Sequence, residues 1–333
     1  MSNIIYLLNS NSMTSIPSRW AEYSNNKRHN ISIRIITLKR LFSFLLKNNK
    51  SYIYHGHHIK VMFLFLLLNT ILRKKSVYTV HGSYLFLSRI NKILLKFILK
   101  YSTSVCFVNK TLYSVLPNNL REIILDKYSI ILNGVELEFQ YKFIDVYKKY
   151  NIGKEDIVLF QPARFVQEKN HYRVIEAVYK AVQINKNIKL ILAGDGKLKD
   201  EINDQIKKLH LENNVFLIGL ITRDEVYCFL KKCDLFLMPS ISEGLNIAFL
   251  EAMSMKSKVL VSDIEQFTYP FEHYNIDPEL YNTYFANALD IESIYKQIIL
   301  ALSKEKNEEF DMSIFSLSNM MDKYNAIYTE LIQ

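Results

Sequence analysis

The sequence predicts an α/β protein made of two doubly wound, Rossmann-like domains. Short apolar runs alternate along the whole chain with segments of helical length and period. Continuous apolar runs indicate strands that are buried on both faces, as in parallel sheets covered by helices. Six of the eight glycines follow such runs, where a turn must start a helix or bring backbone close to a ligand. At 333 residues the chain is long enough for two domains of ordinary size.

The apolar runs give the strands in order. In the first half, strands are expected at residues 3–8, 31–37, 52–54, 77–80, 104–108 and 129–132. In the second half, they are expected at residues 157–161, 189–193, 215–218, 235–238 and 258–262. Helical periodicity lies between most of them, for example at residues 171–184 and 198–210. Ligands bind doubly wound sheets at the carboxyl ends of the strands, so the residues that follow these runs are the candidates for function.

Charge divides the chain into two parts. Residues 1–150 hold 22 Lys/Arg and 6 Asp/Glu, whereas residues 151–333 hold 20 and 27. A basic half and an acidic half suggest domains with different partners. Nucleic acid is not expected, because no helix-turn-helix, zinc-finger or RNP-like pattern is present. An anionic membrane surface or a lipid-linked diphosphate fits the basic half better.

One segment of the basic half is amphipathic. On a helix at residues 85–100, a basic stripe would run along one face, formed by Arg89, Lys92, Lys96 and Lys100. Apolar residues surround it, which allows the helix to lie on a membrane with its lysines toward the headgroups. An ordinary core helix with a solvated basic face explains the same pattern, and the sequence does not decide between the two.

Composition excludes several other classes of protein. The hydrophobic content of 49% is too high for a disordered chain. Three cysteines form no CxxC pair and are expected to be reduced and packed as small apolar residues. The first 30 residues lack a secretory signal pattern, and the longest uncharged apolar stretch, residues 61–72, is too short to span a bilayer. His55, His57 and His58 lack an accompanying carboxylate or cysteine, so no metal site is expected.

Residues 239–253 carry the most informative motif, Pro-Ser-Ile-Ser-Glu-Gly-Leu-Asn-Ile-Ala-Phe-Leu-Glu-Ala-Met. Glu243 and Gly244 follow an expected buried strand, and Glu251 lies two turns into the helix that follows. Carboxylates accept hydrogen bonds from sugar hydroxyls, and a helix N-terminus favours phosphate. The motif therefore suits a polyhydroxylated, phosphorylated ligand. Two glutamates at this spacing alone would also fit a surface acid and a helix-capping acid.

A second group of charges lies at residues 160–170. Arg164 and Lys169 flank a short loop between an expected strand and the helix that starts near His171. Arginine offers a bidentate fork and lysine a point charge, so two cations at this place suit a diphosphate. A solvated loop pair is the alternative. No G-x-G-x-x-G follows any strand, so a dinucleotide fingerprint is absent.

Together these motifs resemble those of retaining glycosyltransferases of family 4, which have the GT-B fold. Glu243 and Glu251 match the E-x7-E motif, and Arg164 and Lys169 match the R-x4-K pattern. His81, in Thr-Val-His-Gly, is similar to a histidine at the end of an N-domain strand. The resemblance is close over residues 130–265 and implies two Rossmann-like domains that face each other across a cleft. It implies no metal and no other cofactor, because GT-B enzymes use side chains and helix dipoles at the diphosphate.

The resemblance also implies roles for these residues. Arg164 and Lys169 would hold the donor diphosphate, helped by the amides of three residues, Gly244, Leu245 and Asn246. Glu251 would hold the ribose hydroxyls and Glu243 the sugar hydroxyls. His81 would approach from the other domain. The acceptor hydroxyl would attack from the leaving-group face with retention of configuration, and the donor phosphate, not a protein group, would act as base.

The expected domains follow the same family pattern. Residues 1–140 would form an acceptor-side domain, and residues 141–311 a nucleotide-sugar-binding domain. The closing segment, residues 312–333, would form a helix that packs back on the first domain. The donor would be a nucleotide diphosphate sugar, expected to be a UDP-sugar. The acceptor would be a lipid-linked oligosaccharide of bacterial surface polysaccharide, such as O-antigen or capsule, reached from a cytoplasmic, peripheral position on the inner face of the plasma membrane.

Two departures from the family pattern leave alternatives open. The loop after the first strand, residues 9–17, has no glycine, although the family has a glycine-rich loop there. Asn246 replaces a residue that is commonly small, which alters which sugar fits. A hydrolysing sugar-nucleotide epimerase would share the fold and the donor site, but no acid and base set for that chemistry is evident. A non-catalytic GT-B partner subunit is the other alternative.

Overall fold

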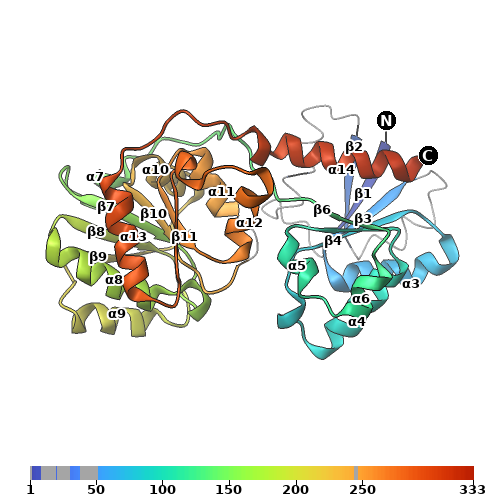
Figure 1. Cartoon of the computed structure of the whole chain (residues 1–333), viewed down its shortest axis with the longest axis horizontal. Coiled ribbons are helices and arrows are strands. Elements are labelled where there is room, and N and C mark those ends of the chain that lie inside the picture. The colour runs from blue at the N-terminus through green and yellow to red at the C-terminus, as the bar shows by residue number, and fades with distance from the viewer. Residues whose placement is uncertain (1, 9–19, 21–30, 38–51, 244–246) are drawn as a thin grey trace. The chain divides into compact units, whose positions relative to one another are not determined.

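The computed structural model describes residues 2–8, 20, 31–37, 52–243 and 247–333. The chain divides into two compact units (Figure 1). Unit 1 comprises Met1–Gly134 and Phe315–Gln333, and unit 2 comprises Val135–Ile314. Each unit is built around one six-stranded parallel sheet, so the predicted α/β class with two doubly wound sheets is confirmed.

The sheet of unit 1 has the strand order β2-β1-β3-β4-β5-β6, and each neighbouring pair is parallel. Its strands are β1 Ser2–Leu8, β2 Ile31–Thr37, β3 Ile53–Gly56, β4 Ser76–Val80, β5 Ser104–Phe107 and β6 Tyr128–Ile130. The helices that the structure describes in this unit are α3 Ile59–Leu72, α4 Arg89–Tyr101, α5 Lys110–Ser114, α6 Asn118–Ile123 and α14 Leu317–Ile332.

Alternating side chains of each strand serve the two faces of this sheet, because successive residues of a strand point to opposite sides. Ile5 and Leu7 of β1 belong to the core under α3, α4, α5 and α6. Ile4 and Tyr6 belong to the core under α14. Both faces are therefore buried, which explains why the strands are continuously apolar in sequence. Figure 1 shows α14 on one side of the sheet and the other helices opposite.

The sheet of unit 2 has the order β12-β11-β10-β7-β8-β9, again all parallel. Its strands are β7 Ile157–Pro162, β8 Ile188–Ala193, β9 Val215–Gly219, β10 Leu235–Met238, β11 Val259–Ser262 and β12 Thr283–Ala286. Its helices are α7 Val146–Lys149, α8 His171–Ile184, α9 Lys199–Lys208, α10 Arg223–Lys232, α11 Ile247–Ser254, α12 Glu265–Tyr274 and α13 Ile291–Ser303. Short 3-10 turns occur in both units. They are η1 Tyr84–Phe86 in unit 1, η2 Gln167–Lys169 and η3 Pro278–Tyr281 in unit 2, and η4 Ser313–Phe315 where the chain returns to unit 1.

Helices cover both faces of this second sheet as well. The helices α8, α9 and α13 share one apolar core with β7, β8, β10 and β11. On the opposite face, Phe229 of α10 stacks on Phe160 of β7 with ring centroids 4.6 Å apart. The central strands are therefore buried on both faces, and in the described residues polar side chains gather at the ends of the strands.

The eleven expected strands are all present, with ends that differ by no more than two residues. One strand, β12, was not predicted, because it is a four-residue edge strand without a long apolar run. The amphipathic helix expected from residue 85 was wrong at its start. The α4 helix begins at Arg89, where Ser88 accepts a hydrogen bond from the amide of Asn91, and Leu85 and Phe86 lie in a separate 3-10 turn.

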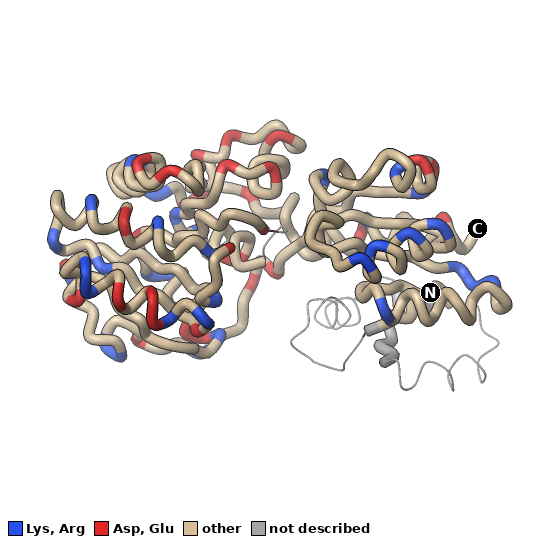
Figure 2. Tube along the Cα trace, turned by 90° about the horizontal axis from the view of Figure 1, so that it is seen from below, with Lys and Arg blue, Asp and Glu red and all other residues tan. Residues whose placement is uncertain are grey.

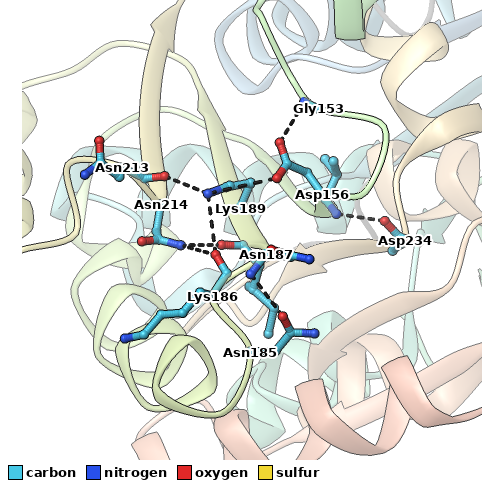
Figure 3. Close-up of polar contacts among 11 residues, drawn as sticks. Gly153, Asp156, Asn185, Lys186, Asn187, Lys189, Asn213, Asn214 and Asp234 are labelled. Carbon is cyan, nitrogen blue, oxygen red and sulfur yellow. Dashed lines mark hydrogen bonds and ion pairs between the residues drawn. The ribbon is translucent and has the colours of Figure 1, made fainter.

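Polar side chains close the amino-terminal edge of the unit 2 sheet (Figure 3). Asn214, just before β9, donates to the carbonyl oxygens of Lys186 at 3.0 Å and Ile188 at 2.8 Å. Lys189 donates to the Asn213 carbonyl at 2.9 Å. These contacts satisfy the backbone groups at the strand starts within the protein itself. The carboxyl-terminal edge carries the residues singled out from the sequence.

None of the helices in the described part of the chain is both long enough and apolar enough to cross a bilayer.

Candidate functional site

The charged residues of the second-half motifs gather at the carboxyl edge of the unit 2 sheet. The strands β7 and β10 are parallel neighbours there, although β8 and β9 lie between them in sequence. The chain thus changes direction across the sheet at this point, and doubly wound sheets bind ligands at such switch points. Lys169 follows β7 and Glu243 follows β10, so the fold brings these two predicted site residues together.

Lys169 and Glu243 form an ion pair through a short contact between Nζ and Oε1. The lysine side chain is 15% exposed and the glutamate 9%. The loops that carry them are also joined by backbone, since the amide of Ile241 donates to the Glu168 carbonyl at 2.9 Å. Charges this far removed from water depend strongly on their partner. The structure therefore holds a compact cation and anion at the switch point.

Asn170 fixes the backbone that carries Lys169. It starts α8 in the left-handed conformation, at φ 60°, which asparagine tolerates better than most residues. Its buried amide donates to the carbonyl oxygens of Pro239 at 2.9 Å and Ala288 at 2.7 Å. The amide of Gln161 donates to the Lys169 carbonyl at 2.9 Å. Three loops at the carboxyl edge are thus held together by one buried side chain.

Arg164 is exposed on the turn after β7, and that turn is set by two glycines of the next crossover. A Cβ atom at Gly194 would stand 1.9 Å from the Ala163 carbonyl oxygen, and one at Gly196 would stand 2.5 Å from the Phe165 carbonyl oxygen. Only glycine allows backbone to approach backbone this closely. The glycine turn after β8 therefore supports the loop that presents Arg164.

Glu251 lies in α11 and is held by two residues of α10. Its Oε1 receives a short ion-pair contact from Arg223, and the Tyr227 hydroxyl donates to the same oxygen at 3.1 Å. Arg223 is the first residue of α10, whose start is fixed by a capping box between Thr222 and Glu225. The glutamate side chain is only 10% exposed. Its carboxylate is therefore oriented by hydrogen bonds and not by solvent.

His81 belongs to unit 1, where it follows β4. Its Nε2 lies 3.0 Å from Nδ1 of His57, which follows β3. Burial lowers the pKa of His81 to about 4, and burial together with the neighbouring histidines lowers the pKa of His57 well below its usual value. Both imidazoles are thus neutral at pH 7. The approach of His81 to the residues of unit 2 stays a prediction.

Gly244, Leu245 and Asn246 lie outside the described residues, as does the glycine-free loop of residues 9–17, so their expected roles stay predictions. Within the described ranges, no group of three or more His, Cys, Asp or Glu side chains is arranged to hold a metal ion. Sequence reasoning missed Arg223 and Tyr227. The pattern Thr222-x-x-Glu225 was the available signal, since it marks a helix start and places Arg223 in the first turn.

Comparisons with known proteins agree with this geometry. The family model described as glycosyl transferases group 1 matches residues 144–314. The chain is 29% identical over 209 residues to the O-antigen biosynthesis glycosyltransferase WclY of Escherichia coli, covering 62% of this chain and 57% of that one. It is 30% identical over 166 residues to the N-acetylgalactosamine-N,N'-diacetylbacillosaminyl-diphospho-undecaprenol 4-alpha-N-acetylgalactosaminyltransferase of Campylobacter jejuni, covering 45% of this chain and 41% of that one.

The match thus spans less than two thirds of the length of these curated relatives. Among solved structures, Anabaena HepE in complex with UDP and glucose superposes with a TM-score of 0.77. The superposition covers 99% of this chain and 100% of the HepE chain, at 14% sequence identity. The two six-stranded units therefore have the GT-B architecture.

Proposed function

Because the chain belongs to the glycosyl transferases group 1 family, we propose that it is a retaining glycosyltransferase that uses a UDP-sugar. The acceptor is a hydroxyl group of a growing lipid-linked oligosaccharide in the synthesis of a bacterial surface polysaccharide, either O-antigen or capsule. The observation that carries the donor site is the ion pair of Lys169 and Glu243 at the switch point of the unit 2 sheet.

This ion pair is suited to a ligand that carries both phosphate and hydroxyl groups. A diphosphate bound at the loop after β7 competes with Glu243 for the ammonium of Lys169, because two phosphates carry more negative charge than one carboxylate. Arg164 adds a bidentate donor on the same loop. Once Lys169 turns to the diphosphate, Glu243 accepts hydrogen bonds from sugar hydroxyls. Both cations then stabilise the negative charge that develops on the leaving nucleotide.

Glu251 is the proposed partner of the ribose hydroxyls. Arg223 and Tyr227 hold its carboxylate in place before any ligand binds, which lowers the entropic cost of binding. The amides of Gly244, Leu245 and Asn246 are proposed to face the phosphates. UDP is the proposed nucleotide because the Anabaena HepE structure carries UDP, and that protein shares the fold of both units.

The stereochemistry follows the family pattern. The acceptor hydroxyl attacks from the face that the diphosphate leaves, the donor phosphate accepts its proton, and the anomeric configuration is retained. His81 contacts the transferred sugar in this scheme. No protein base is assigned, because burial lowers the pKa of His81 to about 4, which makes its imidazole a weak base, and its Nε2 already faces Nδ1 of His57 at 3.0 Å.

Charge supports an acceptor that lies at an anionic membrane surface. Unit 1 carries 20 Lys/Arg and 5 Asp/Glu, whereas unit 2 carries 22 and 28. Figure 2 shows acidic positions spread over unit 2 and few on the coloured part of unit 1. Residues 23–121 include 17 Lys/Arg and not one Asp or Glu. A surface of this charge attracts anionic headgroups and the diphosphate of a lipid-linked sugar. The name of the Campylobacter jejuni relative includes such a diphospho-undecaprenol acceptor.

Exposed apolar side chains accompany these charges on two adjacent helices of unit 1. Leu64, Leu67 and Ile71 of α3 are exposed at a spacing of one helical face, and Ile90 and Ile93 of α4 are about 70% exposed. The two helices pack through a ring contact between Phe63 and Phe97. Arg89, Lys96 and Lys100 are exposed on α4. Apolar residues among cations are typical of peripheral membrane contact.

The first test of the donor site is a thermal-shift panel of UDP-, GDP-, ADP- and TDP-sugars without added metal. UDP-sugars are expected to raise the melting temperature, and Lys169→Ala is expected to remove that response. Lys180→Ala is the matched control, because Lys180 forms an exposed ion pair with Glu292 in the same unit. If the protein is folded and no UDP-sugar raises its melting temperature, the proposal is contradicted. Product analysis then separates sugar transfer from epimerisation.

The membrane contact is tested by co-sedimentation with vesicles. Binding is expected with vesicles that contain phosphatidylglycerol and is expected to weaken with salt. Pure phosphatidylcholine vesicles should bind less. The double variant Ile90→Glu with Ile93→Glu is expected to lose binding while its melting temperature is unchanged, because both side chains are exposed. Equal binding to both kinds of vesicle contradicts the electrostatic part of the proposal.

A further inference from the structure

Four histidines of unit 1 lie close together in sequence or in space, and they do not have the same surroundings. His55 is the last but one residue of β3, and His57 follows that strand, so their side chains stand near each other at its carboxyl end. His81 follows the neighbouring strand β4. His58 precedes α3 and is exposed. His55, His57 and His81 form one cluster at the carboxyl ends of the strands of the unit 1 sheet. In unit 2 the candidate residues also lie at the carboxyl ends of the strands of their own sheet.

His55 is a structural residue of this cluster. It is fully buried, and both of its ring nitrogens have partners. Nδ1 lies 2.6 Å from the hydroxyl of Tyr328 on α14, and Nε2 lies 2.7 Å from the hydroxyl of Thr79 on β4. The Thr79 hydroxyl is in turn 3.1 Å from that of Tyr324. This network joins β3, β4 and the last helix, and it leaves His55 no nitrogen for another task.

His57 and His81 form a separate pair. Nδ1 of His57 faces Nε2 of His81 at 3.0 Å, the distance of a hydrogen bond between ring nitrogens. Aromatic rings surround the pair. Trp20 lies against both imidazoles, with centroid distances of 5.7 Å to His57 and 6.0 Å to His81, and Tyr6 meets His57 edge-on at 4.8 Å. These apolar walls keep both rings in one orientation and favour their neutral forms.

A hydrogen bond between two neutral imidazoles needs one N–H and one lone pair. If His81 donated from Nε2, Nδ1 of His57 would be the acceptor and its own Nε2 would carry the proton. That Nε2 is buried and has no hydrogen-bond partner within the part of the chain that the structure describes. An N–H buried without a partner costs about 1–3 kcal/mol. If His57 donates from Nδ1 instead, its Nε2 carries a lone pair and no proton. A buried acceptor without a partner costs less free energy than a buried N–H without one.

Resting on the proposed function, we infer that His57 is a positioning residue for His81, to which it donates a hydrogen bond from Nδ1. In this arrangement the lone pair of His81 Nε2 is occupied by His57. His81 carries its proton on Nδ1 and offers that N–H as a donor. It then holds an oxygen of the transferred sugar and does not take a proton from the acceptor hydroxyl. The pair thus explains chemically why a histidine at this place serves as a donor.

The experiment is nitrogen-15 NMR of the histidine rings in the full-length protein, without substrate. Long-range proton–nitrogen correlations distinguish a protonated Nδ1 from a protonated Nε2. The His81→Gln variant identifies the His81 signals. In the wild-type protein, His81 is expected to be the Nδ1–H tautomer and His57 also the Nδ1–H tautomer. A wild-type His81 protonated on Nε2 overturns the inference.

Three variants of His57 separate positioning from packing. The amide of asparagine places an N–H near the position of imidazole Nδ1, whereas that of glutamine places it near Nε2. His57→Asn is therefore expected to keep the His81 tautomer, and His57→Gln and His57→Ala are expected to lose it. A His81 tautomer that is unchanged in all three variants overturns the role of His57. The spectra are recorded without substrate, so they test the inference even if the protein proves not to transfer sugar. The proposed function is tested separately, by the loss of donor binding in Lys169→Ala.

Discussion

Lys169→Ala leaves the Glu243 carboxylate in a largely buried position without its cation. Removing one partner of a fully buried ion pair costs about 3–5 kcal/mol, whereas an exposed pair contributes about 0–1 kcal/mol. The two side chains are 15% and 9% exposed, so the pair lies nearer the buried limit. We expect a loss of about 2 kcal/mol, reduced from the buried value because some solvent reaches both groups.

For a unit of the size of unit 2, that loss corresponds to a fall in melting temperature of about 4–8 °C. The measurement is thermal unfolding followed by circular dichroism. Lys180→Ala is the control, because its partner Glu292 is exposed and the side-chain truncation is the same. The control should change the free energy of unfolding by no more than about 1 kcal/mol.

A double variant identifies the cause of the loss. Adding Glu243→Gln to Lys169→Ala removes the carboxylate charge that has lost its lysine, so stability should recover by about 1 kcal/mol or more relative to the single variant. Both variants should fail to respond to UDP, because each lacks the cation for the diphosphate. The reasoning is refuted if Lys169→Ala is as stable as the Lys180→Ala control, or if it responds to UDP as the wild-type protein does.

Three other outcomes are expected. Tyr328→Phe leaves Nδ1 of His55 without its partner and should lower the free energy of unfolding by about 1–3 kcal/mol in denaturant titration; an unchanged midpoint would show that water replaces the hydroxyl. Gly194→Ala should destabilise the protein and weaken UDP binding by calorimetry, because its Cβ would meet the Ala163 carbonyl oxygen; wild-type affinity would be the contrary result. Stability should fall as the pH drops from about 6.5 towards 4, because burial lowers the pKa of His81 to about 4 and the unfolded chain then binds the proton more readily. Melting curves across this range, with His81→Gln as the less pH-dependent comparison, check the sign.

Much of the fold could be predicted because buried parallel strands have a simple pattern. A strand covered on both faces must be apolar at every position, as in Leu235–Met238, and such runs stand out against polar loops. The strand Thr283–Ala286 was missed because it is short and lies at the edge of its sheet. The start of α4 was misplaced because Leu85 and Phe86 continue the apolar pattern, whereas the hydrogen bond that the Asn91 amide donates to the Ser88 hydroxyl decides where the helix begins.

The candidate site was predictable in its residue types but not in its contacts. Arg164, Lys169 and Glu243 could be singled out because each follows an expected strand, and Glu251 because it lies in the helix after Glu243 at the E-x7-E spacing. The partners of these residues come from other segments. Arg223, which holds Glu251, is 28 positions away in sequence, and no short-range pattern joins them. The contact between His57 and His81 could not be predicted either, because it depends on the pairing of β3 with β4.

These unpredicted partners share one physical feature, which bears on how the protein uses its charges. In the described structure Lys169 is paired with Glu243, and Glu251 is paired with Arg223. A cation or an anion without a partner in these half-buried places would cost free energy in the absence of ligand. Pairing removes that cost and keeps each group within reach of the position where it is needed. A bound nucleotide sugar would then exchange one set of partners for another, so binding would depend on the difference between two ion-pair arrangements. On this reasoning, a substitution at either member of the Lys169–Glu243 pair changes affinity for the donor and stability of the empty protein together, whereas a substitution at exposed Arg164 changes affinity alone.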